Sequence, residues 1–227
     1  MTPSPPLHTA LVTGGAVRVG RAISLALAGE GLRVVVHYNR SSAPAEELVR
    51  QIRDGGGEAV AIGGDLSQHA EVERVAREAE EAFGGVDVLV NNASVFPEEG
   101  FDEVDPDLWD QTLAVNLRAP FFLTQALGAR MRARGQGLVI NMVDLAGLQP
   151  WARYAAHGIS KAGLVHLTKV AARALAPEVR VAGIAPGTVL PPEDTSTAEL
   201  ERLAKRTLLG SIGSPDDVVG ALAFALE

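Results

Sequence analysis

The sequence predicts a single α/β domain, a doubly wound parallel sheet with helices on both faces. Short runs of apolar and β-branched residues alternate with amphipathic stretches along the whole chain, as parallel sheets require. One run, Val34–Val36, is apolar at every position, as in strands that are covered on both sides. A glycine-rich turn joins the first apolar run to the first amphipathic stretch, which favours a Rossmann-type arrangement.

The pattern places strands and helices in strict alternation. We expect strands at Ala10–Thr13, Arg33–His37, Ala59–Gly63, Val86–Val90, Leu138–Met142 and Val179–Ile184. We expect helices at Val19–Gly29, Ala45–Asp54, Ala70–Phe83, Leu108–Arg134, Ala155–Ala176, Ala198–Arg206 and Pro215–Leu226. No repeat or linker divides residues 1–227, so we expect one domain that carries both binding and catalysis.

Two segments depart from this alternation. Residues 1–7 are interpreted as a loose leader, because Met1–Pro6 is proline-rich and lacks the basic residues of a signal peptide. Residues 188–206 combine a loop rich in proline and acidic residues with a short helix. Because this loop follows the last expected strand, at the carboxyl edge of the sheet, we expect it to be a substrate lid.

Composition excludes several classes of protein. The 227 residues are 47% apolar, which is enough for a sizeable core, but no apolar run is long enough to cross a membrane. A net charge of −8 argues against a nucleic-acid-binding surface. There is no cysteine, and the five histidines lack metal-ligand spacing, so we expect neither disulfides nor a metal site. We expect a cytoplasmic protein that acts on a small molecule.

The stretch Thr13–Gly20 carries most of the information about function. It follows the apolar run Thr9–Val12 and precedes an apolar-periodic segment, Ile23–Leu27. A strand, a glycine turn and a helix in this order form a cradle for nucleotide phosphates, because glycine admits close approach and the helix N-terminus offers free N–H groups. The large cation Arg18 stands inside this loop, where small residues are common.

The end of the second expected strand indicates which dinucleotide binds. NAD enzymes usually have an acidic residue there for the ribose 2′-hydroxyl. This chain instead has the stretch His37–Ser42, which contains no acid. Arg40 and Ser41 suit a 2′-phosphate, through guanidinium contacts and a hydroxyl donor. The sequence therefore predicts NADP(H) as the cofactor.

These motifs resemble the short-chain dehydrogenases/reductases over nearly the whole chain. The matching segments are Thr13–Gly20, Asp65-Leu66, Asn91-Asn92-Ala93, Asn116, Lys161 and Pro186-Gly187. Within that family the chain is most similar to the pteridine reductases. They share an arginine in the glycine loop, a His-Tyr-x-Arg-Ser strand end and an Asn-Asn-Ala-Ser-x-Phe segment, here Arg18, His37–Ser41 and Asn91–Phe96.

The resemblance implies a set of binding residues. Its implied cofactor contacts are Thr13, Gly14, Arg18, Val19, Gly20, His37, Asn39, Arg40, Ser41, Asp65, Leu66, Asn92, Ala93, Lys161, Pro186, Gly187 and Thr188. Its implied substrate contacts are Arg18, Ser94, Phe96, Asp144 and Tyr154. An isolated Phe96 would be assigned to the core, but the motif places its ring against a flat pterin opposite the nicotinamide. Trp151 either faces the pocket or only seats its loop.

The implied catalytic residues are Asp144, His157, Lys161 and Asn116. The family has a serine, a tyrosine thirteen positions later and a lysine four beyond that; this chain has Asp144, His157 and Lys161 there. Aspartate at position 144 agrees with the pteridine reductases, whereas histidine at 157 departs from them. Residues 157 and 161 share one helix face, so Lys161 would bind the nicotinamide ribose and influence the neighbouring proton donor.

Three interpretations of His157 follow. An imidazolium can donate the proton that the family's phenol donates. Asp144 can itself be the acid if hydride binding and burial raise its pKa. Alternatively, the chain keeps the cofactor fold with altered or lost turnover.

Asn116 has a physical reason to matter. It lies in the expected helix Leu108–Arg134, and Pro120, four residues later, has no N–H to bond the Asn116 carbonyl. A free carbonyl there can hold a water, and the family uses this asparagine to anchor a proton-relay water. The alternative is an ordinary proline kink.

The resemblance implies NADPH-dependent reduction of a C=N bond in a dihydropterin or dihydrofolate. The alternatives are a carbonyl reductase, for example of 3-oxoacyl groups, or an NADP(H)-binding protein without turnover. We also expect a homo-oligomer, a dimer or homotetramer, formed through apolar faces around Phe121, Phe122, Leu164 and Leu167. The chain stops at Glu227 in a helical pattern, where the family continues into a further strand.

Overall fold

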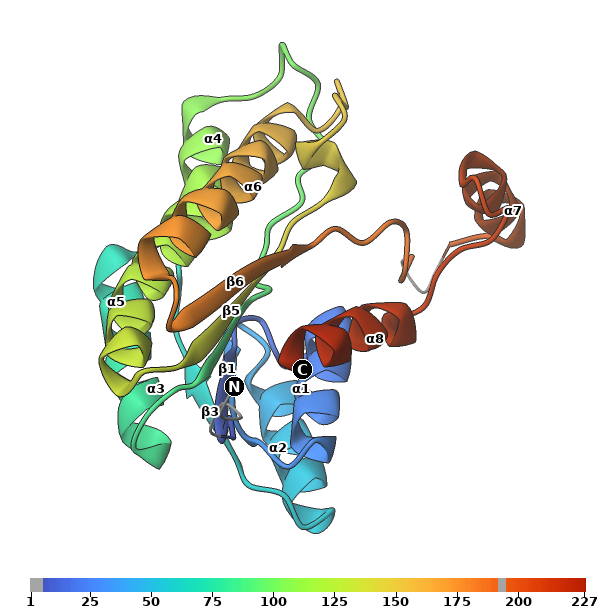
Figure 1. The fold of residues 1–227 in the computed structure, drawn as a ribbon. Helices are drawn as coiled ribbons and strands as arrows, with labels where there is room; N and C mark the ends of the chain where they lie inside the picture. Colours follow the sequence, from blue (N-terminus) through green and yellow to red (C-terminus); the bar gives the residue numbers. More distant parts are fainter. Residues whose placement is uncertain (1–5, 192–194) are drawn as a thin grey trace.

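A computed structural model of the protein describes residues 6–191 and 195–227. All six strands form one parallel sheet in the order β3-β2-β1-β4-β5-β6, which confirms the predicted fold class (Figure 1). The strands are β1 (Thr9–Val12), β2 (Arg33–Tyr38), β3 (Ala59–Gly63), β4 (Val88–Asn91), β5 (Gly137–Met142) and β6 (Val179–Ile184). The strand order reverses between β1 and β4, and in sheets of this kind ligands bind at the carboxyl ends of the strands beside such a reversal.

Helices cover both faces of the sheet, as predicted (Figure 1). They are α1 (Arg18–Gly29), α2 (Ser42–Asp54), α3 (His69–Phe83), α4 (Pro106–Leu113), α5 (Ala119–Arg134), α6 (Ala155–Leu175), α7 (Thr197–Arg206) and α8 (Pro215–Leu226). One core layer packs β-strand side chains against α3, α5 and α6, and the other packs them against α1, α2 and α8.

Strand alternation explains the two layers. In β1 every residue is buried, and Leu11 belongs to one core layer while Ala10 and Val12 belong to the other. Successive side chains of a strand point to opposite faces, so a strand covered on both sides must be apolar throughout. This is the pattern that the sequence displays.

The prediction of one continuous helix over Leu108–Arg134 is wrong. The segment forms α4, then a π-helix, η1 (Ala114–Arg118), and then α5. The N–H of Ala119 bonds to the carbonyl of Ala114, five residues back. Pro120 has no N–H to continue the α-helical ladder, so the wider turn accommodates it.

The strand predicted at Val86–Val90 is displaced, since β4 spans Val88–Asn91. The Val86 N–H bonds to the Glu80 carboxylate, and Asp87 N–H bonds to the carbonyl of Thr9 before the ladder begins. The apolar pattern begins at Val86, before strand pairing starts at Val88, so the pattern alone misplaces the boundary.

The prediction that Leu164 and Leu167 belong to an assembly surface is also wrong. Leu164 and Leu167 are buried inside the chain's own core, where α6 packs on the sheet. Phe121 remains 42% exposed, and Phe122 is partly buried against the core.

The predicted lid and leader fall partly outside the described residues, which exclude 192–194 and 1–5. The helix of the lid exists as α7, has no buried residue and lies apart from the sheet (Figure 1). No helix in the described part of the chain has both the length and the apolarity to cross a membrane.

Candidate active site

The glycine loop is fastened to the end of β4. The hydroxyl of Thr13 accepts the N–H groups of Asn92 and Ala93, at 2.9 and 3.0 Å, and donates to the carbonyl of Val90. The side-chain amide of Asn92 donates to the carbonyls of Thr13 and Gly14. The two loops at the strand-order reversal therefore form one rigid unit.

Gly20 is required by this unit, because an added Cβ would lie 2.1 Å from the Gly14 carbonyl oxygen. Within the described residues no side chain caps the start of α1, so its first N–H groups are available to a ligand. Arg18 adopts a left-handed backbone conformation with φ of +53°, and its guanidinium donates to the carbonyl of Leu190. The loop thus contacts the segment that begins the predicted lid.

His37 is buried and bridges two loops. Its Nδ1 accepts the N–H of Gly14 at 3.2 Å, and its Nε2 lies 3.0 Å from the carbonyl of Gly64. Burial lowers the pKa of His37 to about 4, which is consistent with a neutral ring whose Nε2–H donates to Gly64. Its ring therefore supports the loop from within the protein.

The other predicted cofactor residues line the same carboxyl edge of the sheet. Asn39 and Arg40 follow β2 and are exposed, and Arg40 forms no ion pair with any described residue. Asp65 follows β3 and accepts the N–H of Ser67. The remaining segment, Pro186–Thr188, directly follows β6.

Three of the four predicted catalytic side chains lie close to one another. Asp144 precedes the short 3₁₀-helix η2 (Leu145–Gly147) and caps it, because its Oδ1 accepts the N–H of Ala146 at 2.7 Å. Its Oδ2 lies 3.5 Å from Nε2 of His157 on α6. One turn later, Lys161 donates from Nζ to the carbonyl of Met142 at 2.7 Å.

The environment shifts the charges of this cluster. Burial lowers the pKa of Lys161 to about 8, against a smaller opposing effect of Asp144. Burial acts to raise the pKa of Asp144, but the facing His157, the Ala146 N–H and the Lys161 ammonium together bring it below its ordinary value. The contacts of Asp144 in this structure therefore favour its ionised form, and a raised pKa for Asp144 during hydride transfer stays a prediction.

Asn116 enters the cluster through its side chain. Its Oδ1 accepts the N–H of Val95 at 2.8 Å, and its Nδ2 donates to the carbonyl of the same residue at 2.9 Å. Nδ2 also donates to the hydroxyl of Ser160 at 3.1 Å, and Oδ1 accepts from Ser94 at 3.2 Å. The π-turn of η1 thereby holds the segment after β4, which carries the predicted substrate contacts.

An aromatic cluster covers the catalytic residues. Phe96 is 52% exposed and stacks on Tyr154, with ring centroids 4.5 Å apart and an angle of 23°. It also meets His157 edge to face at 4.4 Å. Trp151 packs on Tyr154 at 6.0 Å, so it belongs to this cluster.

Sequence reasoning missed Val95 and Ser160, which hold His157 and Asn116. His157 Nδ1 lies 3.1 Å from the Val95 carbonyl, and the Ser160 hydroxyl donates to the His157 carbonyl. Val95 acts through its backbone, so no residue type could have identified it. Ser160 stands three positions after His157 on a helix, and that spacing is the one available signal.

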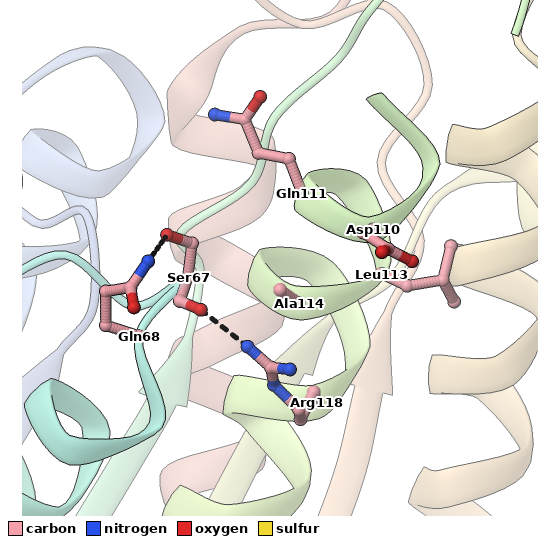
Figure 2. Close-up of a pocket in the computed structure, with 7 residues that line it drawn as sticks. All are labelled: Ser67, Gln68, Asp110, Gln111, Leu113, Ala114 and Arg118. Carbon is pink, nitrogen blue, oxygen red and sulfur yellow. Dashed lines mark hydrogen bonds between the residues drawn. The ribbon is translucent and has the colours of Figure 1, made fainter. Parts of the chain in front are cut away.

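A surface cavity of about 510 Å³ lies away from these residues (Figure 2). The loop between β3 and α3 meets α4 and η1 there, and Arg118 donates to the carbonyl of Ser67. Its lining is Ser67, Gln68, Asp110, Gln111, Leu113, Ala114 and Arg118, and none of these is a predicted site residue.

Curated relatives align along nearly the whole chain. L-rhamnose 1-dehydrogenase (NAD(P)(+)) of Azotobacter vinelandii is 36% identical over 95% of this chain and 88% of its own. A 3-oxoacyl-[acyl-carrier-protein] reductase of Synechocystis sp. is 32% identical over 96% of this chain and 88% of its own.

Solved structures match equally broadly. FolM alternative dihydrofolate reductase 1 from Brucella canis, complexed with NADP, has a TM-score of 0.90 and 33% identity, covering 96% of this chain and 87% of that one. A gluconate 5-dehydrogenase from Burkholderia cenocepacia, in complex with NADP and tartrate, has a TM-score of 0.88 and 30% identity, covering 97% and 88%. The family model for short chain dehydrogenases matches residues 8–201. Because this match spans most of the chain, the protein belongs to the short-chain dehydrogenase/reductase family of oxidoreductases.

Proposed function

We propose that this oxidoreductase uses NADPH to reduce a C=N bond of a dihydropterin or of dihydrofolate. The observation that carries the proposal is the position of Phe96, a half-exposed ring that lies directly against His157. A flat heterocycle gains about 0.5–1.5 kcal/mol from stacking on such a ring beyond the burial of its area. A sugar or an acyl chain can pack on the same ring, but only a flat aromatic heterocycle gains this stacking between two π-systems.

The residues present fit an NADP(H) cofactor. The uncapped start of α1 and the tightly packed Gly20 suit a pyrophosphate, as in other dinucleotide loops. Arg40 and Ser41 follow β2, where no acid competes for the ribose, and would hold a 2′-phosphate. The FolM and gluconate dehydrogenase structures, both described with NADP, support this choice.

In this proposal each catalytic residue has a distinct role. Bound NADPH supplies a hydride. Lys161 holds the nicotinamide ribose, and Phe96 with Tyr154 orients the pterin and excludes water. The His157–Asp144 pair stands beside the substrate position and supplies the proton that the reduced nitrogen requires.

A substrate comparison tests the proposal. NADPH oxidation is measured with dihydrobiopterin, dihydrofolate and an acetoacetyl thioester, and NADP⁺ reduction is measured with L-rhamnose. We expect kcat/KM for one of the first two to exceed that of the others at least tenfold. The opposite order would assign the protein to the carbonyl or sugar enzymes.

The variant His157→Tyr serves as the matched control for turnover. If the tyrosine form reduces a dihydropterin and the native chain reduces none of the four substrates, the native chain is a cofactor-binding protein. Comparable or higher turnover by the native chain establishes that histidine at position 157 supports catalysis.

Arg40→Ala tests the cofactor assignment. Loss of a charge-assisted contact to the 2′-phosphate costs about 1.5–3 kcal/mol, so the Kd for NADPH should rise roughly ten- to a hundredfold. The Kd for NADH should stay the same. The control is Arg50→Ala, which removes an exposed arginine of α2 and should change the Kd of neither cofactor. Equal weakening of both cofactors would contradict a role in binding the 2′-phosphate.

A further inference from the structure

The orientation of the Asn116 amide is fixed by the Val95 backbone. The Val95 N–H can only donate, so Oδ1 must face it, and the Val95 carbonyl can only accept, so Nδ2 must face it. The second hydrogen of Nδ2 is directed to the hydroxyl of Ser160. Both hydrogens of this amide are therefore already committed.

This geometry selects one tautomer of His157. Its Nδ1 lies 3.1 Å from the Val95 carbonyl and 3.4 Å from Nδ2 of Asn116. Because Asn116 has no hydrogen left to give, Nδ1 meets an acceptor and must carry a proton. The second nitrogen, Nε2, then has no proton in the neutral ring.

The opposite nitrogen faces a carboxylate. Nε2 is buried, has no hydrogen-bond partner among the described residues, and lies 3.5 Å from Oδ2 of Asp144. If Nε2 has no proton, its lone pair faces the ionised carboxylate of Asp144, and two hydrogen-bond acceptors repel each other. Moving the proton from Nδ1 to Nε2 would remove this repulsion. The same move would leave the lone pair of Nδ1 facing the Val95 carbonyl oxygen, which is also an acceptor.

We call the hydrogen bonds that join the Val95 backbone, the Asn116 amide and the Ser160 hydroxyl the Val95–Asn116 clamp. We propose that this clamp makes the His157–Asp144 pair hold one extra proton between Nε2 and Oδ2. We also propose that the pair is the proton donor of the reaction. The donor role rests on the proposed function, whereas the extra proton does not. In each reduction a hydride adds to the C=N carbon and the pair's proton passes to the nitrogen. The pair is left as a neutral imidazole and a carboxylate, and a solvent proton restores it.

The surrounding charges bear on where this proton lies. On α6 the Lys161 ammonium opposes a charged His157 ring, and Asp144, which precedes η2, favours one. On the side of Phe96 stand Tyr154 and Glu98, and Glu98 is paired with Arg153 at 2.9 Å. A proton on Nε2 gives an imidazolium beside a carboxylate, and a proton on Oδ2 gives a neutral imidazole beside a carboxylic acid; both hold the extra proton.

Nuclear magnetic resonance of the cofactor-free protein tests the extra proton without turnover. With ¹⁵N-histidine and ¹³C-aspartate labels at pH 7, His157 should carry hydrogen on both nitrogens, or on Nδ1 beside a protonated Asp144. The signals are assigned by comparison with His157→Gln. A neutral ring protonated at Nε2, or a neutral ring protonated at Nδ1 beside an ionised Asp144, would overturn the proposal.

Ser160→Ala tests the clamp without removing Asn116. It frees one Nδ2 hydrogen whose nearest remaining acceptor is Nδ1 of His157, so the Nε2–H tautomer should become populated. Thr112→Val is the control, because it removes a buried hydroxyl on α4 that has no hydrogen-bond partner among the described residues. Spectra of Ser160→Ala that equal those of the control would show that the clamp does not select the tautomer.

The kinetic readout separates this inference from the proposed function. For the proton donor, kcat should fall about tenfold per pH unit once the pair loses its proton. In Ser160→Ala this fall should begin at least one pH unit lower, with KM unchanged. Doubly protonated His157 in a protein that reduces no pterin refutes the proposed function alone, and pterin turnover with an Nε2–H ring refutes the inference alone.

Discussion

His157 is held on three sides by groups that suit an imidazole. The Val95 carbonyl faces Nδ1, Asp144 faces Nε2, and Phe96 meets the ring edge to face. A tyrosine, which the family has at this position, has one hydroxyl and no tautomers, so it would use only part of this environment. The site therefore accommodates histidine through specific contacts rather than by leaving a space.

At Lys161 the charge that the proposed cofactor contact needs is opposed by the free energy of folding. Burial lowers its pKa from 10.5 to about 8, so holding the charge below pH 8 costs roughly 3 kcal/mol of folding free energy. The unfolded chain binds this proton more tightly, so the cost is fully present below the folded pKa and is relieved as pH rises toward 10.5.

We therefore predict that Lys161→Met is more stable than the native chain at pH 7 by about 1–2 kcal/mol, since it also loses the bond to Met142. Urea unfolding at pH 7 and pH 9.5 measures this. The advantage should shrink by about 2 kcal/mol at the higher pH. A stability difference that does not depend on pH would show that the ammonium is not the source.

Phe96→Ala should separate the two ligands of the site. Loss of the ring removes stacking and burial worth about 2–4 kcal/mol from a pterin, whereas the cofactor loop stays intact. Titration calorimetry should find dihydropterin binding weakened at least thirtyfold and NADPH binding changed less than threefold. Phe101→Ala, which removes another exposed ring, is the control. Equal weakening of both ligands would contradict the pterin stack.

At the scale of elements, the interruption between α4 and α5 decides where Asn116 stands. The π-turn η1 buries its side chain against the segment after β4 and against α6. A buried polar chain also links the strands beneath the site, as Asn91 donates to Asn141 and Asn141 donates to Thr168 on α6. Such networks fix β4, β5 and α6 relative to one another.

The contact between η2 and α6 sets the separation of Asp144 from His157. Gly147 makes this contact possible, because a Cβ there would lie 2.7 Å from the carbonyl carbon of Lys161. Gly147→Ala should destabilise the protein by about 1–3 kcal/mol and lower kcat at least tenfold, since backbone must move.

Gly29→Ala, at the open end of α1, controls for the substitution itself, because nothing lies near its Cβ. It should leave kcat unchanged and stability equal or higher by up to about 1 kcal/mol. Thermal unfolding and steady-state kinetics compare the two variants. If Gly147→Ala behaves as the control does, η2 does not determine the geometry of the pair.

At the scale of the whole molecule, the strand-order reversal between β1 and β4 brings the glycine loop and the Asn92 segment together.

The formation of a homo-oligomer stays a prediction. It now rests on exposed apolar side chains of α5 and α6, namely Phe121, Ile159 and Val170. Phe121→Glu should lower the sedimentation mass to that of a smaller species, because a charge cannot be buried unpaired. Phe224→Glu on α8 is the control; a native monomer would contradict the prediction.

Much of the fold was predictable because burial on both faces leaves continuous apolar runs such as Val34–Val36, while helices that are covered on one face leave a helical period. The candidate site could be proposed where a residue type suggests its own chemistry, as with Asp144, His157 and Lys161, and the catalytic roles of these three residues stay predictions. Val95 and the broken helix were less accessible, because a backbone carbonyl has no identity in the sequence and Pro120 signals a break without its geometry.

The sequence by itself determined the parallel α/β fold and the glycine loop, and it supplied the candidate catalytic groups, because these depend on local pattern and side-chain chemistry. The tertiary structure alone decided which atom of His157 faces Asp144. That choice depends on hydrogen-bond donors and acceptors brought together from the segment after β4, from η1 and from α6. This pairing of donors with acceptors is fixed only when distant segments meet, since each donor hydrogen makes one strong hydrogen bond.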